Sequence, residues 1–516
     1  MDSNTGQPPI LIPEPESDLI AAQVALQQLR ENLAGANALA VLEQVTHWLE
    51  TRAPQIAPPL QPWLELIVQI DQLAQHHQLR LVPQYLDTQR MRKLTESQLW
   101  RTTFGYWQRL GEAYLRCLLR YQAAPEGESE FRAQLPLVLS RLLHTLMRQL
   151  KWTLLRYARV EDRIWRELGQ GYLLAESWGL ADRSGRLCER NRRESTPRQE
   201  LLKALMLAQA APDALRPAQL HIAERVTSCL SHHFALHNTA GPGCGFRFDL
   251  SMHQPPTRAR AGVAVAPLQR FFGAGTSAPA LQALLTQAQL RGALPQEVRL
   301  GGEFTRDDLL ATLRHLQRHW SDARPGRRDE RERAVARLTV LPGLIAATRW
   351  IDATPGGGEE WIPPRAESWI VFDASASGFG ALLPAQAGDW LAVGALMAVR
   401  APGQVKPRMA VLRRITADAE NQSRVGVEYL GQQSARVTLH PDIADGIVQA
   451  GMNAILLSQQ PDAQGTLELL QPPGGLELAR SLRMQLGAQR YRLETLATLE
   501  QGRDYRHVRY HLQGQD

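Results

Sequence analysis

The residues with the clearest chemical potential in this 516-residue chain lie in its last third, and the first of them are arginines. The segment 324–337 holds six arginines and three acidic residues. Arginine suits an anionic ligand that carries bases, because its planar guanidinium binds phosphate through two hydrogen bonds, stacks on purines and pairs with one edge of guanine. Arg333 and Arg337 are spaced RxxxR and directly precede an apolar run, 338–345. Because the apolar run follows at once, we prefer this pair as the candidate site arginines.

The register of the arginine pair is open, because the same spacing occurs twice upstream. The two other pairs are Arg324 with Arg328 and Arg327 with Arg331. A charged run of this kind is also typical of a solvated linker, so the arginines need a second feature to indicate a site.

The second feature is a short polar motif, Asp373-Ala-Ser375-Ala-Ser-Gly378, which follows the apolar strand candidate 369–372. Asp373 and Ser375 alternate, so they are predicted to point to the same side of a strand end. Gly378 allows a positive φ or a close approach to a ligand. Together these residues predict a hydrogen-bonding edge that could accept from and donate to a nucleobase.

Other candidate sites are weaker, and we predict no enzyme, no metal and no cofactor. His315 and His319 are four residues apart, but the glutamate of a metalloprotease motif is missing, so a helix surface is the better interpretation. The glycine clusters at 273–275 and 356–358 open no phosphate-binding helix and indicate turns. The four cysteines are scattered and predict neither a zinc site nor a disulfide framework: Cys117, Cys188, Cys229 and Cys244.

The elements that must position these residues change character along the chain. We predict a disordered tail over 1–17 and an all-α domain over 18–238, in which Thr196 and Gln199 form a capping box and leucines recur at helical spacing from 135 to 150. Arg141, Arg148 and Lys151 fall largely off that leucine stripe. Such a stripe is typical of a helix packed in a bundle.

The second half predicts β-structure. A mixed α/β bridging region over 239–323 is followed by short apolar runs separated by Gly, Pro, Asp and Asn, which indicate antiparallel strands. We predict one small β-barrel with its arginine-rich lead-in over 324–440 and a second small β module over 441–516. The fold class is therefore α+β multidomain: an all-α half, then two β modules.

Charge and hydropathy exclude some classes of protein. The chain has 58 basic and 52 acidic residues, a mild excess, and shows no helix-turn-helix or aromatic-interleaved basic strand, so nucleic-acid binding is disfavoured. No apolar run approaches the roughly 20 residues of a membrane span. The first residues are acidic and proline-rich rather than basic and apolar, so we expect no secretory signal and a cytoplasmic protein.

The two motifs together resemble those of the PilZ domain, a small β-barrel family that binds the bacterial second messenger cyclic di-GMP. The family's signatures are RxxxR and (D/N)xSxxG, which here read Arg333 to Arg337 and Asp373 to Gly378, and the later stretch RVGVEYL is similar to the family's closing strand. The resemblance spans about 327–431, a fifth of the chain, and leaves the helical half outside it.

The resemblance implies a role for each site residue. Arg333 and Arg337 would hold the phosphates and guanine faces of cyclic di-GMP, Asp373 and Ser375 would hydrogen-bond a guanine, and Gly378 would keep the strand close. It thus implies a non-enzymatic cyclic di-GMP receptor in bacterial signalling, in which binding at the lead-in alters domain arrangement or partner binding, with a protein partner for the helical domain. The alternative is a ligand-free adaptor with a degenerate barrel.

Overall fold

A computed structural model describes most of the chain, and its residues fall into two compact units. The described residues are 15–32, 37–53, 59–87, 93–124, 129–188, 193–260, 266–291, 304–323, 326, 329–353, 363–384, 388, 390–417, 422–441, 451–458, 460–474 and 481–515. The first unit comprises Met1–Arg156, Val160–Pro212 and Pro217–Pro325, and the second comprises Tyr157–Arg159, Asp213–Arg216 and Gly326–Asp516. We call them the helical unit and the barrel unit.

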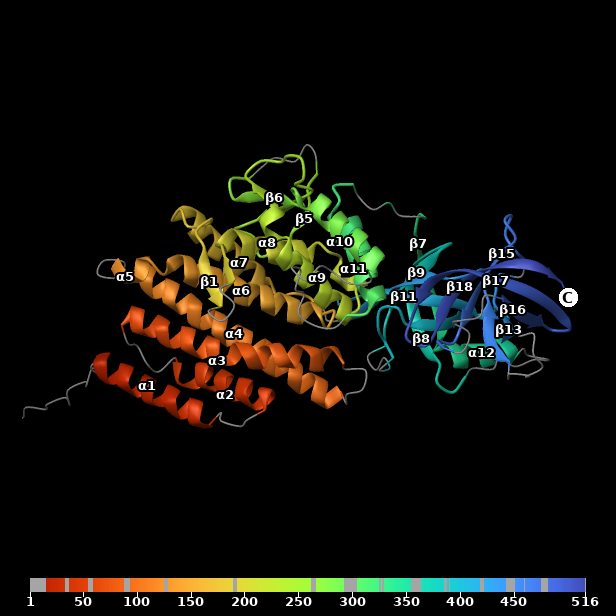
Figure 1. Cartoon of the computed structure of the whole chain (residues 1–516), viewed down its shortest axis with the longest axis horizontal. Coiled ribbons are helices and arrows are strands. Elements are labelled where there is room, and N and C mark those ends of the chain that lie inside the picture. The colour runs from red at the N-terminus through yellow and green to blue at the C-terminus, as the bar shows by residue number, and fades with distance from the viewer. Residues whose placement is uncertain are drawn as a thin grey trace, which may run out of the picture. The chain divides into compact units, whose positions relative to one another are not determined.

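The helical unit is built mainly from long helices that pack on one another (Figure 1). Its helices as far as α9 are α1 (Pro15–Asn32), α2 (Ala38–Thr51), α3 (Leu60–Leu86), α4 (Lys93–Ala123), α5 (Ser129–Arg132), α6 (Leu135–Leu154), α7 (Asp162–Ser177), α8 (Pro197–Ala208) and α9 (Pro217–Cys229). The predicted capping box is confirmed at α8, where Thr196 accepts from the Gln199 amide and the Gln199 side chain accepts in return from the Thr196 amide. Helix α1 begins at Pro15, inside the range predicted as a tail, whose residues 1–14 lie outside the described residues.

Helix α6 is buried on every side, which the leucine stripe alone did not predict. Its off-stripe residues Arg141, Arg148 and Lys151 are 3%, 5% and 0% exposed. Each meets a carboxylate from another helix, since Arg141 pairs with Asp71 of α3, and Lys151 donates to Glu224 of α9 at 2.8 Å. Acidic side chains distant in sequence thus cover the part of α6 that lies off the leucine stripe.

The region predicted as all-α also contains short strands. Strands β1 (Gly185–Cys188) and β2 (Arg193–Ser195) form an antiparallel pair beside α6. A Cβ on Gly185 would lie 2.7 Å from the Leu137 Cα, so only glycine lets this backbone lie directly against the start of α6. The strand pair is a local correction to the helical prediction.

The region predicted as a bridge belongs to the helical unit. Its strands belong to a four-stranded sheet in the order β3 (Ala235–His237), β6 (Gln269–Gly273), β4 (Phe246–Asp249) and β5 (Thr257–Arg258), and its helices are α10 (Ser277–Arg291) and α11 (Arg306–Trp320). Strand β3 falls inside the range predicted as all-α and is a second correction to it. On α11, His315 hydrogen-bonds the Ala210 carbonyl at 2.6 Å, and the Trp320 indole donates to the Met206 carbonyl. This histidine is therefore part of the packing of the unit.

The first barrel is closed by six antiparallel strands, as the fold class predicted. Its strands in barrel order are β10 (Leu396–Arg400), β11 (Arg408–Ala417), β12 (Ser423–Tyr429), β9 (Gly378–Leu382), β8 (Glu367–Ser375) and β7 (Glu332–Pro342). Trp369, Val371 and Phe379 point into its core. Strand β7 begins at Glu332, so Arg333 and Arg337 lie on the strand itself rather than in a lead-in before it.

The second module is also a closed six-stranded barrel. Its order is β13 (Ala435–Pro441), β14 (Met452–Leu456), β15 (Thr466–Gln471), β18 (Arg506–Gln515), β17 (Gln489–Gln501) and β16 (Ser481–Leu486). Because β13 begins at Ala435, this barrel starts a few residues before the predicted boundary at 441. Helix α12 (Leu344–Asp352) packs between the two barrels in a shared apolar cluster with Trp350 and Tyr505 buried in it.

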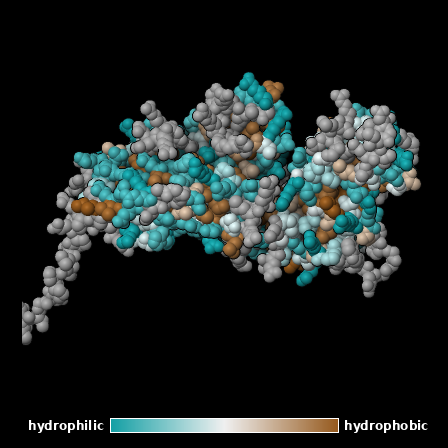
Figure 2. Space-filling model, turned by 60° about the horizontal axis from the view of Figure 1, so that its bottom comes forward, coloured by the Kyte–Doolittle hydropathy of each residue, from teal (hydrophilic) through white to brown (hydrophobic). Residues whose placement is uncertain are grey.

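None of the helices that the structure describes is both long and apolar enough to cross a bilayer. On the face drawn in Figure 2, apolar residues form small separate patches among polar ones. Scattered patches of this size are normal for protein surfaces.

Candidate functional site

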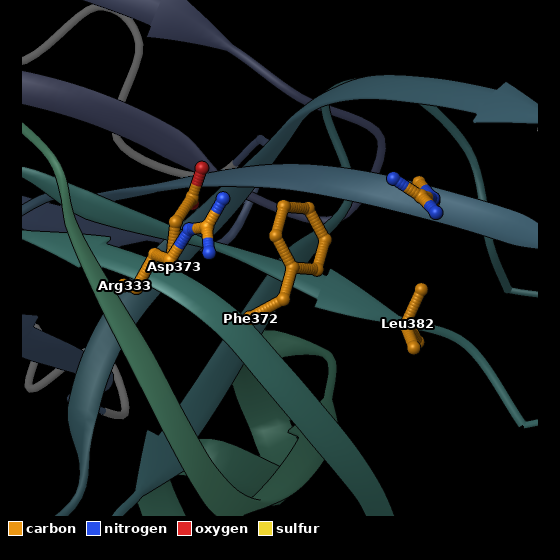
Figure 3. Close-up of a pocket in the computed structure, with 5 residues that line it drawn as sticks. Arg333, Phe372, Asp373 and Leu382 are labelled. Atoms are coloured by element: carbon orange, nitrogen blue, oxygen red, sulfur yellow. The ribbon is translucent and has the colours of Figure 1, made fainter.

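A cavity of about 400 Å³ lies on the outer face of the first barrel, at the strands that carry both sequence motifs (Figure 3). Its walls come from four strands, because it is lined by Arg333 of β7, Phe372 and Asp373 of β8, Leu382 of β9 and Arg424 of β12. The volume falls within the range typical of small-ligand sites. Thus one residue of each motif, Arg333 and Asp373, lies in the same cavity.

A β-bulge in β8 turns Asp373 toward this cavity. The strand alternates normally up to Val371, which pairs with Ala381 and points into the barrel core. The next pair is Asp373 with Gly380, so Phe372 is an extra residue on β8. A bulge of this kind redirects the side chains that follow it, and here Phe372 and Asp373 both line the outer cavity.

Gly380 leaves the space that these two side chains occupy. A Cβ built on Gly380 would lie 2.5 Å from the Asp373 Oδ1 and 2.7 Å from the Phe372 Cζ. Any larger residue would therefore push the carboxylate and the ring out of their present positions. Gly380 was not singled out from the sequence, because its role depends on the bulge in the neighbouring strand.

The charge of the cavity is set by arginines and one carboxylate. Arg331 donates to both oxygens of Asp373, at 2.9 and 3.1 Å, while Arg333 lies directly across the β7–β8 ladder from Asp373. Arg331 is 38% exposed, so this ion pair is worth about 0–1 kcal/mol and a ligand can displace it. The structure therefore brings Arg331 to the motif aspartate, in addition to Arg333.

Arg337 lies on the same outer face of the barrel but further along β7 than Arg333. It pairs with Ile370 across the β7–β8 ladder, and Ile370 pairs with the cavity residue Leu382 across β8–β9. Arg337 is not among the described residues that line the cavity. Of the other RxxxR pairs, Arg324, Arg327 and Arg328 lie outside the described residues, so only Arg331 can be placed.

Ser375 and Gly378 close the β8–β9 hairpin. They pair across the ladder, and the Ser375 hydroxyl donates to the Gly378 carbonyl at 3.3 Å. A Cβ on Gly378 would lie 2.1 Å from the carbonyl oxygen of Val427 on β12. The close approach that the glycine permits is thus that of a neighbouring strand, and the motif shapes the turn beside the cavity.

Phe372 and Arg424, like Leu382, line the cavity but belong to neither motif. Phe372 is the last residue of the apolar run 369–372, and Arg424 begins the stretch RVGVEYL. The guanidinium carbon of Arg424 lies 5.6 Å from the centroid of the Phe372 ring. Both residues belong to predicted strands, but no sequence feature places the two side chains together.

These groups can bind a planar, partly anionic ligand. Arginines bind phosphate, the Asp373 carboxylate can accept hydrogen bonds from a base edge, and Phe372 and Leu382 offer apolar surface. In the part of the chain that the structure describes, no group of three or more His, Cys, Asp or Glu side chains could hold a metal ion.

Comparison with known families gives one finding, in the other half of the chain. Residues 24–241 match the family model FimW_N, described as the N-terminal domain of the cyclic-di-GMP receptor FimW. The match covers less than half of the chain and runs from within α1 to just beyond β3, so it does not reach the barrels. No curated protein matches the chain.

Proposed function

We propose that this chain is a receptor for cyclic di-GMP and that the ligand binds in the outer cavity of the first barrel. The observation that carries the proposal is the meeting of Arg333 and Asp373, one from each motif, in that cavity. The similarity of residues 24–241 to a domain of a cyclic-di-GMP receptor supports the same ligand from a separate part of the chain.

In this proposal, each motif residue has a defined task. Arg333 binds a phosphate or a guanine face from within the cavity, and Arg337 adds positive charge at its rim. Asp373 gives up its hydrogen bonds from Arg331 and instead accepts hydrogen bonds from the N1–H and N2–H groups of a guanine. One carboxylate can accept both of them. Ser375 and Gly378 hold the hairpin and the neighbouring strand in place around the base. The site binds its ligand without changing it.

The helical unit is then the output module. A receptor needs a part that reports occupancy, and a ligand does this by binding one of two arrangements better than the other. We propose that a protein partner of the helical unit receives this change.

The proposal is tested by calorimetric titration of the full chain with cyclic di-GMP, with cyclic di-AMP as the matched ligand. Both ligands carry two phosphates, so only base recognition separates them. We expect cyclic di-GMP to bind saturably and with clearly higher affinity than cyclic di-AMP. Absence of binding at high micromolar cyclic di-GMP would favour the alternative, a ligand-free adaptor.

Two variants add a matched comparison. Arg333→Ala removes a cavity arginine, whereas Arg490→Ala removes an exposed arginine from β17 of the second barrel. We expect binding to weaken in the first variant alone. Equal affinity in both would contradict the proposed place of the site.

A further inference from the structure

We infer that Phe372 and Arg424, which lie in neither motif, form the base-stacking platform of this site. The inference rests on the proposed function and identifies what holds the face of the base, as distinct from its edge. It is carried by the placement of an aromatic ring and a guanidinium in the same outer cavity.

Phe372 has no visible role in the barrel core. Its neighbours Trp369 and Val371 are core residues of the first barrel, whereas Phe372 is half-buried and belongs to none of the described apolar clusters of the barrel unit. A large ring on the outer face of a strand exposes apolar surface to water, which is unfavourable unless something covers the ring. A ligand that stacks on the ring supplies that cover.

The ring is held in a fixed place. Alternation after the inward-pointing Val371 places Phe372 on the outer face, the bulge keeps Asp373 on that same face, and the missing side chain at Gly380 lets the ring lie over β9. Figure 3 shows the ring between Asp373 and Leu382 in the cavity. Because Asp373 is the next residue, a base that lies on the ring has the carboxylate at its edge.

Arg424 completes the platform from the next strand. It lies opposite Leu382 on the β9–β12 ladder, and its guanidinium carbon is 5.6 Å from the ring centroid. A planar guanidinium stacks on bases as an aromatic ring does and also attracts phosphate. The pair thus brings two planar groups into the same cavity, and base stacking of this kind tolerates any base.

The test measures the affinity of full-length variants for cyclic di-GMP by calorimetry. Phe372→Leu keeps an apolar side chain without a π-face, and Phe372→Tyr keeps the face. Arg424→Lys keeps the charge without the planar group. We expect affinity to fall about 5- to 100-fold for Phe372→Leu and severalfold for Arg424→Lys, and to stay within about twofold for Phe372→Tyr.

Leu499→Ala, an exposed apolar position on the second barrel, serves as the control, and melting temperatures check that each variant folds. If Phe372→Leu fails to fold, Arg424→Lys decides the question alone. If the wild-type chain binds and both Phe372→Leu and Arg424→Lys bind with unchanged affinity, the platform is overturned. The receptor proposal then remains intact. An equal loss in Phe372→Tyr and Phe372→Leu also overturns it. Absence of wild-type binding overturns both proposals.

Discussion

At the scale of single residues, the proposed site should depend on Asp373 and on the arginines that face it. In the structure its carboxylate accepts two hydrogen bonds from Arg331, and in the proposed complex a guanine would replace them. We expect Asp373→Ala to weaken cyclic di-GMP binding by about 1.5–3 kcal/mol, the worth of a charge-assisted hydrogen bond, which is roughly ten- to a hundredfold. Competition calorimetry with cyclic di-AMP should show a smaller preference for guanine. An unchanged preference would exclude Asp373 from base recognition.

Arg333 should act through charge as well as through hydrogen bonds. We expect Arg333→Ala to weaken binding by a similar amount and to reduce its dependence on salt, because exposed charges attract less at high ionic strength. Titrations at low and high salt measure this. A salt dependence equal to that of the unchanged chain would mean that Arg333 does not contact a phosphate.

Gly380 gives the sharpest steric prediction. Its replacement by alanine places a methyl group 2.5 Å from the Asp373 carboxylate and 2.7 Å from the Phe372 ring, so affinity should fall about tenfold or more. Gly426 lies opposite Gly380 on the β9–β12 ladder, and a Cβ there meets only the Arg414 Cβ at 3.4 Å. Gly426→Ala should therefore bind normally. Calorimetry of the two variants compares them directly, and equal affinities would argue against the cavity.

Sequence patterns predicted part of this residue-scale description. The spacing of Asp373 and Ser375 correctly placed them at the end of β8, next to a turn. The pattern could not show that a bulge turns Phe372 and Asp373 to the same cavity, because an extra residue is defined only against the neighbouring strand. Phe372 and Gly380 were missed for that reason, and Arg424 was missed because no local spacing connects β12 to this cavity.

At the scale of elements, α6 is held by buried charges that the helical pattern did not reveal. Glu224 of α9 accepts from Lys151 at 2.8 Å and pairs with Arg148 at 3.4 Å, and all three side chains are buried. Removing one partner leaves uncompensated buried charge. We expect Glu224→Gln to lower the free energy of unfolding by about 3–5 kcal/mol.

Denaturant unfolding of the full chain measures this loss in the helical transition. Glu65→Gln on α3, which alters an exposed carboxylate, is the control and should change stability by less than about 0.5 kcal/mol. A loss in Glu224→Gln no larger than that would mean that the buried pairs contribute little to packing.

A buried histidine on α6, His144, should make the free energy of unfolding depend on pH. Burial, opposed by the adjacent Glu200, lowers the pKa of His144 to about 4 from an ordinary 6.5. Between these values the unfolded chain takes up a proton that the folded chain excludes, so stability should fall as the pH drops from about 6.5 toward 4. Unfolding at several pH values measures the slope. It should be shallower in His144→Gln, and an equal slope would contradict the assignment.

Helix patterns thus predicted where elements occur but not what covers them. The leucine spacing placed α6 correctly, and Thr196 and Gln199 marked the start of α8. Burial of the α6 arginines could not be predicted, because their partners come from α3 and α9 and no local spacing connects these residues to α6.

At the scale of the whole molecule, the two barrels share a core and form one unit. Trp350 of α12 is 1% exposed in the apolar cluster between them, and Arg413 of β11 pairs with Glu500 of β17 at 2.6 Å. We expect Trp350→Ala to destabilise both barrels together, by about 3–5 kcal/mol. Hydrogen exchange should show equal loss of protection in β11 and β15.

Ile345 on the same helix is 70% exposed, so Ile345→Ala is the control and should leave exchange unchanged. Loss of protection confined to one barrel would show that the barrels unfold separately. The sequence predicted two consecutive β modules in the right order, but their shared core depends on α12, which lies where a strand end was expected.

The central claim is that cyclic di-GMP binds the first barrel, although the family match lies in residues 24–241. Ultraviolet crosslinking of cyclic di-GMP to the full chain, followed by peptide mapping, tests it most directly. We predict crosslinked peptides from β7, β8 and β12, which carry Arg333, Phe372 and Arg424. Crosslinks confined to peptides of residues 24–241 would contradict the claim.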